Sequence, residues 1–339
     1  MSDHWRPNGI IVYLDQNKWV DLSRAALGLI DAQDVYKVYE SLQSLSDQGF
    51  VHFPLSLAHY TETHWPQNEN RRRRLASVMW NLSRGFAMAP LSIIVPYEID
   101  QALARFFPGR VPPRDFQIFG YGAFHAIGQP SQALKISWPA AASLPPDFKR
   151  YFEAYLDNQA QLVLLSGSMP ITGESFGREG YTEAKQGFQQ QLDSWVSEMA
   201  PLTAQQRQRR AYQSIMADIW IHLKEALDQH AIPEADFAAL GEDKGRQFID
   251  SLPSRRIERH LLLQWAKNAQ LLARSSDLND WASLGPALAY CDVVVTEKHF
   301  ANIVGREGFT TRATVLTNLC DLPSTIANLS QPPSPCREQ

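Results

Sequence analysis

The stretch Ile10–Leu14, which reads IIVYL, is a short run of apolar and mostly β-branched residues. Such a run is typical of a strand buried inside a parallel sheet. Asp15, Gln16 and Asn17 follow it directly, and a helix is expected from about Lys18 onward. Because parallel α/β sheets bind ligands beyond the carboxyl ends of their strands, this junction is the first candidate position for chemistry.

The segments that follow alternate between helix and strand. Residues 32–47 carry apolar side chains at helical spacing and end at Gly49, and FVHFPL at 50–55 predicts a second strand. Ser56 stands where the N-cap of the next helix belongs, and Glu62 lies in the second turn of that helix. The order β-α-α-β-α predicts an α/β fold with a parallel sheet flanked by helices.

The middle of the chain has a different character. It contains two proline-rich stretches and no run that reads as a strand, and it is dominated by long helical patterns at 148–165, 179–198 and 203–230. The alternation returns after it, with helices at about 255–272 and 280–290, the β-branched strand DVVVT at 292–296 and a last strand within 309–319. The prediction is therefore an α/β domain interrupted by a mainly helical insertion.

The corresponding domain boundaries follow from these shifts in composition. The α/β domain is expected in two parts, 1–95 and 251–325, separated by the helical insertion at 96–250. Residues 326–339, which end in QPPSPCREQ, have the composition of a flexible tail.

Composition restricts the class of protein. Thirty-two Lys and Arg against thirty-six Asp and Glu give a formal charge of −4 over 339 residues, which excludes a uniformly basic nucleic-acid binder but not a local basic groove. Three widely spaced cysteines make no disulfide framework and no CxxC zinc site. Without a signal peptide or a run of about 20 apolar residues, the chain is expected to be cytoplasmic, with no membrane partner.

The polar residues at the carboxyl ends of the predicted strands and at the following helix starts are mostly oxygen donors. They are Asp15, Asn17, Glu62, Asn279, Asp280, Thr296 and Glu297. No glycine-rich phosphate loop, GxSxG or HExxH motif accompanies them. Carboxylates that converge without His or Cys suit a hard cation, Mg²⁺ or Mn²⁺, and such ions typically serve phosphodiester chemistry.

Three of these segments together resemble the motifs of PIN-domain nucleases. They are YLDQNKWV at 13–20, FPLSLAHYTET at 53–63 and DWASLGPALAYCDVVVTEKHF at 280–300, and they occur in the order that the family has. The resemblance covers about half of the chain. It implies a PIN-like fold in which Asp15, Glu62, Asp280 and a fourth acid are the catalytic metal ligands, and in which Asn17, Asn279 and Thr296 orient them.

One position departs from the family pattern. Many members place the fourth acid two residues after the threonine, where this chain has Lys298. Glu297 and Asp292 are the candidates to replace it. The helix that begins at Asp280 is expected to run antiparallel to the strand that follows it, so Asp280 lies near the carboxyl end of that strand. Asp292 lies at the opposite end, about 16 Å from Glu297, and two groups so far apart cannot share a metal. We favour Glu297 as the ligand and interpret Asp292 as a capping or salt-bridge residue.

The resemblance also implies a function. It indicates a Mg²⁺- or Mn²⁺-dependent nuclease, most often an endoribonuclease, such as the PIN toxins of toxin–antitoxin modules. RNA is then the substrate, and an antitoxin or a protein of a defence complex is the expected partner. The alternative is a PIN-like scaffold with a degraded site that binds nucleic acid or a protein, and the lysine departure favours it.

Two basic features remain. Arg71–Arg74 is a run of four arginines, of which at most two can face one groove on a helix, and we assign nucleic-acid binding to Arg71 and Arg74. Arg255 and His260 resemble the Rx4–6H signature of the metal-independent HEPN ribonucleases. The polar residue that usually follows the arginine is missing there, so this pair is the weaker hypothesis.

Overall fold

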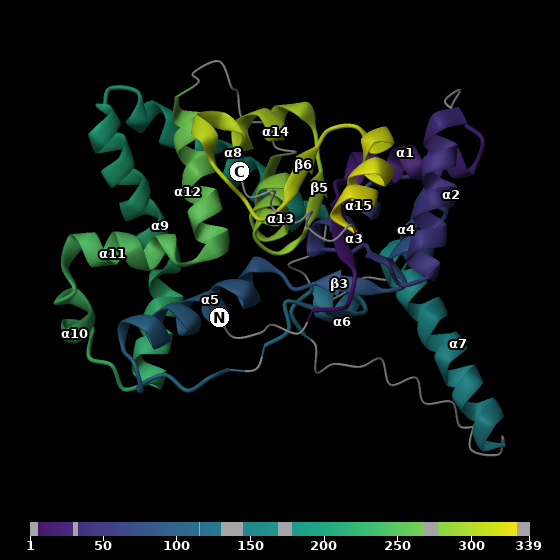
Figure 1. Cartoon of the computed structure of the whole chain (residues 1–339), viewed down its shortest axis with the longest axis horizontal. Helices are drawn as coiled ribbons and strands as arrows, with labels where there is room; N and C mark the ends of the chain where they lie inside the picture. Colours follow the sequence, from purple (N-terminus) through teal and green to yellow (C-terminus); the bar gives the residue numbers. More distant parts are fainter. Residues whose placement is uncertain are drawn as a thin grey trace, which may run out of the picture. The chain divides into compact units, whose positions relative to one another are not determined.

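The structure is a computed structural model, which describes residues 6–29, 33–114, 116–129, 145–168, 178–267 and 277–330 (Figure 1). It divides into two compact units. We call them the β1 unit (Pro7–Ala89, Phe119–Gly180 and Asn318–Gln339) and the β5 unit (Met1–Arg6, Pro90–Ile118 and Tyr181–Thr317).

The β1 unit contains two pairs of strands and the helices around them. Its elements are β1 (Ile10–Leu14), α1 (Gln16–Ala26), α2 (Gln33–Asp47), β2 (Val51–His52), α3 (Leu57–Thr63), α4 (Glu69–Ser83), β3 (Phe86–Met88), β4 (Phe119–Tyr121), α6 (Ala123–Ala126), α7 (Pro146–Leu165), a 3-10 turn (Leu319–Asp321) and α15 (Leu322–Leu329).

The strand β1 forms where the apolar run predicts it. It pairs in parallel with β2, with Ile10 opposite Val51, and four of its five residues are buried. β2 is shorter than the predicted strand 50–55 because Pro54 has no amide hydrogen to continue the ladder. Beyond the proline, Leu55 forms a single parallel bridge instead.

Helices α1, α2 and α4 pack together in this unit, and they are the purple to blue helices of Figure 1. Their buried faces carry apolar side chains such as Trp19, Leu22, Leu42 and Met79. The glycine predicted to end α2 does so: Gly49 has φ of 72°, which L-residues with a side chain rarely adopt, and the next amide, of Phe50, bonds back to Leu45.

The β5 unit is mostly helical. Its elements are α5 (Leu91–Phe106), α8 (Arg178–Met199, in this unit from Tyr181 on), α9 (Ala204–Gln229), α10 (Glu234–Ala238), α11 (Gly241–Asp250), α12 (Pro253–Ala266), α13 (Asp277–Tyr290), β5 (Val293–Val295), α14 (Lys298–Val304), a 3-10 turn (Arg306–Gly308) and β6 (Thr314–Leu316).

One hydrophobic cluster of this unit lies between α5, α9 and α11. Ile219, Leu223 and Leu227 recur every four residues along α9 and meet Ile99 and Phe248 from the other two helices, as expected of an amphipathic helix. β5 and β6 pair in parallel over three positions. Parallel strands connected through helices are therefore present in each unit, so the α/β class is confirmed.

Some predicted boundaries differ from the observed elements. The segment 96–250, where no strand was expected, contains β4, which pairs antiparallel with β3. α15 extends to Leu329, past the predicted start of the tail at 326, and residues 331–339 lie outside the described chain. The two units group the segments differently from the predicted domains, which remain a prediction.

Candidate active site

Asp15 lies at the carboxyl end of β1, immediately before α1. The residue is 6% exposed. Its backbone carbonyl accepts hydrogen bonds from the amides of Lys18 (2.9 Å) and Trp19 (3.3 Å), so Asp15 occupies the N-cap position. Within the described chain, however, its carboxylate caps none of the amides of α1. Asp15 is thus buried at the end of β1, and its side chain does not serve as the cap of α1.

His59 holds the strand end on which Asp15 sits. Its Nδ1 accepts a hydrogen bond from the backbone amide of Ser56 (2.9 Å), so its Nε2 carries the proton and donates to the carbonyl of Leu14 (2.8 Å). The ring stacks on Tyr13 with 5.0 Å between ring centroids. Burial lowers the pKa of His59 to about 4, so the ring is neutral and keeps this arrangement at neutral pH.

Glu62 lies on α3 and is half-buried. A second hydrogen bond joins this helix to the β1–α1 junction, because Nε2 of Gln16 donates to Oγ1 of Thr63 (3.1 Å). The first bond joins His59 to Leu14 and the second joins Thr63 to Gln16, so the two bonds flank Glu62 on α3 and Asp15 at the end of β1. The structure thus holds together the two elements that carry these carboxylates.

Thr296 and Glu297 follow β5 in the same way. The amide of Thr296 donates to the carbonyl of Leu316 (2.9 Å) and extends the parallel ladder by one residue. Thr296 is buried. Glu297 is half-buried at the N-cap position of α14, and in the described part of the chain its side chain caps none of that helix's amides. Glu297 thus has the same position as Asp15, at the N-cap of a helix that follows a parallel strand.

The remaining predicted site residues lie on helices. Asn17 is exposed in the first turn of α1, and Asn279 is buried on α13. Asp280 also belongs to α13, but its side chain lies outside the described residues.

Asp292 lies at the opposite end of β5 from Glu297. It forms ion pairs with Arg6 and with Arg312, the second at 3.4 Å. The interpretation of Asp292 as a salt-bridge residue is therefore confirmed.

The proposed ligands are divided between the two units. Asp15, Asn17 and Glu62 belong to the β1 unit, whereas the residues on α13 and those after β5 belong to the β5 unit. Among the side chains that the structure describes, no group of three or more His, Cys, Asp or Glu forms a metal-binding cluster. The convergence of all four acids on one site stays a prediction.

The donor atoms at the β1–α1 junction fit a hard cation. Both ring nitrogens of His59 are hydrogen-bonded to backbone groups. His59 therefore offers no nitrogen ligand to a metal at this junction. The candidate ligands on these two elements are the carboxylate oxygens of Asp15 and Glu62. Oxygen-only donor sets select Mg²⁺ or Mn²⁺ over Zn²⁺.

The four arginines of α4 separate into two pairs. Arg72 donates to backbone carbonyls, among them that of Pro66 (2.7 Å), and Arg73 forms an ion pair along the helix at 2.7 Å. Arg71 and Arg74 line a hollow between α1 and α4. As the spacing predicts, two of the four face one groove.

The HEPN-like pair is not brought together. Arg255 forms ion pairs from α12 with Asp218 (2.5 Å) and Glu258 (2.6 Å). His260 instead stacks on Phe309, with 4.0 Å between the ring centroids. Five residues along a helix correspond to a rotation of about 140° from the same face, which explains why the two side chains make separate contacts.

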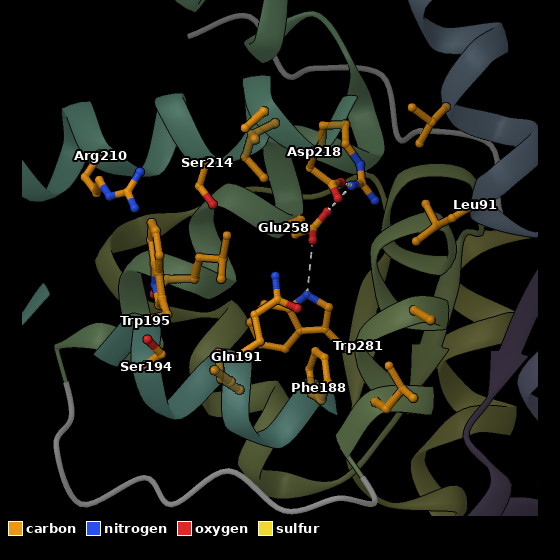
Figure 2. Close-up of a pocket in the computed structure, with 18 of the residues that line it drawn as sticks. Leu91, Phe188, Gln191, Ser194, Trp195, Arg210, Ser214, Asp218, Glu258 and Trp281 are labelled. Carbon is orange, nitrogen blue, oxygen red and sulfur yellow. Dashed lines mark hydrogen bonds and ion pairs between the residues drawn. The ribbon is translucent and has the colours of Figure 1, made fainter. Parts of the chain in front are cut away.

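Arg255 belongs to a pocket of about 670 Å³ in the β5 unit, between α8, α9, α12 and α13. Figure 2 shows Glu258 at its centre, where it accepts a hydrogen bond from Nε1 of Trp281 (3.3 Å). Burial raises the pKa of Glu258, and Arg255 opposes the shift. Trp195 and Phe188 add aromatic walls. Acids and bases are mixed in this pocket, so it does not attract a polyanion.

Sequence reasoning missed two groups that the structure makes important. His59 stands three residues after the N-cap Ser56, where a capping box puts a side chain that reaches back, and this spacing is the signal that could have found it. Glu98 is a buried carboxylate that accepts hydrogen bonds from Ser254 and from Tyr290 (2.6 Å). These partners lie more than 150 residues away, and no local pattern signals them.

Comparison of the chain with protein-family models, curated proteins and solved structures finds no match. In the part of the chain that the structure describes, no helix has the length and apolar character needed to cross a membrane.

The free energy of unfolding is expected to fall as the pH is lowered from 6.5 to about 4, because unfolded His59 binds a proton over a range in which the folded residue stays neutral. A lowered folded pKa means that this stability is complete above the unfolded pKa and is lost as the pH falls through the folded pKa. The shift corresponds to roughly 3 kcal/mol. Urea denaturation at a series of pH values measures it. His59→Gln should remove this part of the slope, and an unchanged slope would contradict the assignment.

Proposed function

We propose that this chain is a Mg²⁺- or Mn²⁺-dependent nuclease that hydrolyses RNA. The observation that carries the proposal is the buried carboxylate of Asp15 at the carboxyl end of a parallel strand, with the helix that bears Glu62 tied to the same junction by two hydrogen bonds. Glu297 at the end of β5 supports it, and so does the resemblance of the three motifs to PIN-domain nucleases.

Each residue has a defined part in this proposal. Asp15, Glu62, Asp280 and Glu297 hold one or two cations, and Asn17, Asn279 and Thr296 orient the carboxylates. A bound Mg²⁺ or Mn²⁺ supplies an activated water and neutralises charge on the phosphate oxygens. His59 keeps the carbonyl of Leu14, and with it the strand end, in place. The products would carry a 5′ phosphate and a 3′ hydroxyl.

The resemblance also supports a biological setting. The family that the three motifs resemble includes the PIN toxins of toxin–antitoxin modules, and we infer that this chain acts as a toxin or defence effector with an antitoxin or defence-complex protein as its partner.

The proposal is tested by incubating the purified chain with single-stranded RNA in Mn²⁺, in Mg²⁺ and in EDTA. Cleavage in both metals, loss of cleavage in EDTA and products with 5′ phosphates are the expected results. Cleavage that persists in EDTA and is lost in His260→Ala would favour the HEPN hypothesis instead. Binding of RNA without cleavage in any metal would favour the alternative, a PIN-like scaffold with a degraded site. The lysine at position 298, which is exposed and stands where many family members have an acid, supports that alternative.

Glu297→Gln is expected to reduce cleavage at least about tenfold, with partial rescue at higher Mn²⁺, because the lost ligand mainly weakens metal affinity. The matched substitution Asp292→Asn removes a carboxylate from the other end of β5 and breaks its ion pairs with Arg6 and Arg312. It should change the melting temperature more than the cleavage rate. The opposite pattern in the two variants would overturn the choice of Glu297.

A further inference from the structure

The hollow between α1 and α4 contains a third arginine. Arg24, in the last turn of α1, lines it together with Arg71 and Arg74 of α4. The hollow has a volume of about 540 Å³, and all three arginines are exposed. Arg24 has no sequence motif around it and enters the group only because α1 packs on α4.

The three guanidinium groups are available to a ligand. Within the described residues none of them forms an ion pair, whereas Arg73 on the same helix does. No carboxylate is among the described residues that line the hollow, and its other polar side chains are the neutral Ser23, Asn68 and Asn70. A hollow with three cations and no acid concentrates anions, and guanidinium groups bind phosphate in a bidentate manner.

The hollow also has an apolar part. Leu27 and Leu29 line it and are 43% and 60% exposed. Exposed leucines beside arginines suit a ligand that alternates apolar rings with phosphates. Single-stranded nucleic acid has this alternation, whereas inorganic phosphate and acidic peptides offer no flat apolar faces.

We propose that the Arg24–Arg71–Arg74 hollow is a binding subsite for single-stranded RNA, in which the arginines hold backbone phosphates and the leucines contact bases. The proposal takes its ligand class from the proposed function and adds the place where the substrate is held. Arg24 lies nine residues after Asp15 on one helix, about 14 Å along its axis. The subsite therefore holds nucleotides that lie beyond the cleaved bond.

The test measures binding rather than cleavage. A fluorescent single-stranded RNA of about 12 nucleotides is titrated with the full chain in EDTA, between about 50 and 200 mM salt. The slope of log affinity against log salt should become less steep by ~0.7 in each of Arg24→Gln, Arg71→Gln and Arg74→Gln, and by ~2 in the triple variant. The reason is that binding releases fewer counterions when a phosphate contact is lost. Arg73→Gln is the matched control and should leave the slope unchanged.

The leucines give a second, independent readout. Leu27→Ser with Leu29→Ser should weaken binding by about threefold to tenfold at every salt concentration without altering the slope. An excess of poly-glutamate should compete much less well than unlabelled RNA. Unchanged slopes in the arginine variants would overturn the subsite, and so would equal competition by poly-glutamate.

Failure of the subsite is distinguishable from failure of the proposed function. If Asp15→Asn retains cleavage while the arginine variants change the salt slope, the metal site is wrong and the subsite stands. If cleavage depends on Asp15 but the slopes do not change, the subsite alone is overturned. Cleavage of a dinucleotide should not respond to the arginine substitutions, because such a substrate does not reach the hollow.

Discussion

Asp15→Asn is expected to lower metal-dependent cleavage of RNA by about 100-fold to 1,000-fold, which corresponds to a loss of ~3–4 kcal/mol of transition-state stabilisation. Asp15 is 6% exposed, and asparagine keeps the shape of its side chain while removing the charge that is proposed to hold a cation. The fold should stay intact, because the hydrogen bond from His59 to Leu14 does not involve the Asp15 side chain. Single-turnover cleavage and thermal unfolding, measured on the same preparation, check both statements.

Asp21→Asn is the matched control, since it neutralises an acid on the same helix two turns further along. It should leave cleavage unchanged. Mn²⁺ at about 100 times its dissociation constant should stabilise the unsubstituted chain by ~2.7 kcal/mol and the Asp15→Asn chain much less.

Glu62→Ala and Asp280→Ala should abolish cleavage as Asp15→Ala does, while the chain stays folded. Full activity in any two of these three alanine variants would contradict the assignment of the metal ligands.

Arg255→Met is expected to lower the free energy of unfolding by about 3–5 kcal/mol, because it leaves a buried carboxylate without its cation. The side chains of Arg255 and Glu258 are 5% and 19% exposed and are joined at 2.6 Å. Asp218, the other partner, is 61% exposed, so Asp218→Asn should cost about 1 kcal/mol or less. Chemical denaturation of the two variants provides the measurement.

A double variant separates the charge from the packing. Arg255→Met combined with Glu258→Gln removes both charges and keeps an acceptor for Nε1 of Trp281. Most of the lost stability should return, since the uncompensated charge is gone. A double variant as unstable as Arg255→Met alone would show that the arginine acts through its packing in the pocket.

Local sequence patterns predicted the secondary structure correctly where the residues of a single segment determine its conformation. The apolar run at Ile10–Leu14 became β1 at the predicted bounds, because its side chains gain by burial on both faces of a parallel strand. Ser56 caps α3 as predicted. The predicted strand at 50–55 was too long because a proline interrupts its hydrogen bonds, and β4 was missed because three residues carry too little periodicity to be recognised.

Several residues of the candidate site could also be predicted from local sequence patterns. Asp15 and Glu297 are candidates by sequence alone, since a carboxylate after a buried strand is a local feature, and the structure places both just after parallel strands. Glu62 is a candidate through its place in the helix that Ser56 begins, and it lies on α3. The choice between Asp292 and Glu297 followed from the expected antiparallel course of the helix and the strand, together with the length of the strand. The ion pairs of Asp292 agree with its interpretation as a salt-bridge residue.

What the sequence by itself determined was the presence of the strands β1, β2, β5 and β6 and of the long helices, the oxygen character of the candidate ligands and the limit of two arginines per groove. Each of these depends on residues within a few turns of one another. Only the tertiary structure decided that His59 binds the end of β1, that Arg24 joins Arg71 and Arg74, and that Arg255 and His260 serve separate contacts. These outcomes depend on which helix packs on which strand, and the free energy of that packing is spread over many side chains distant in sequence, so no single motif encodes it.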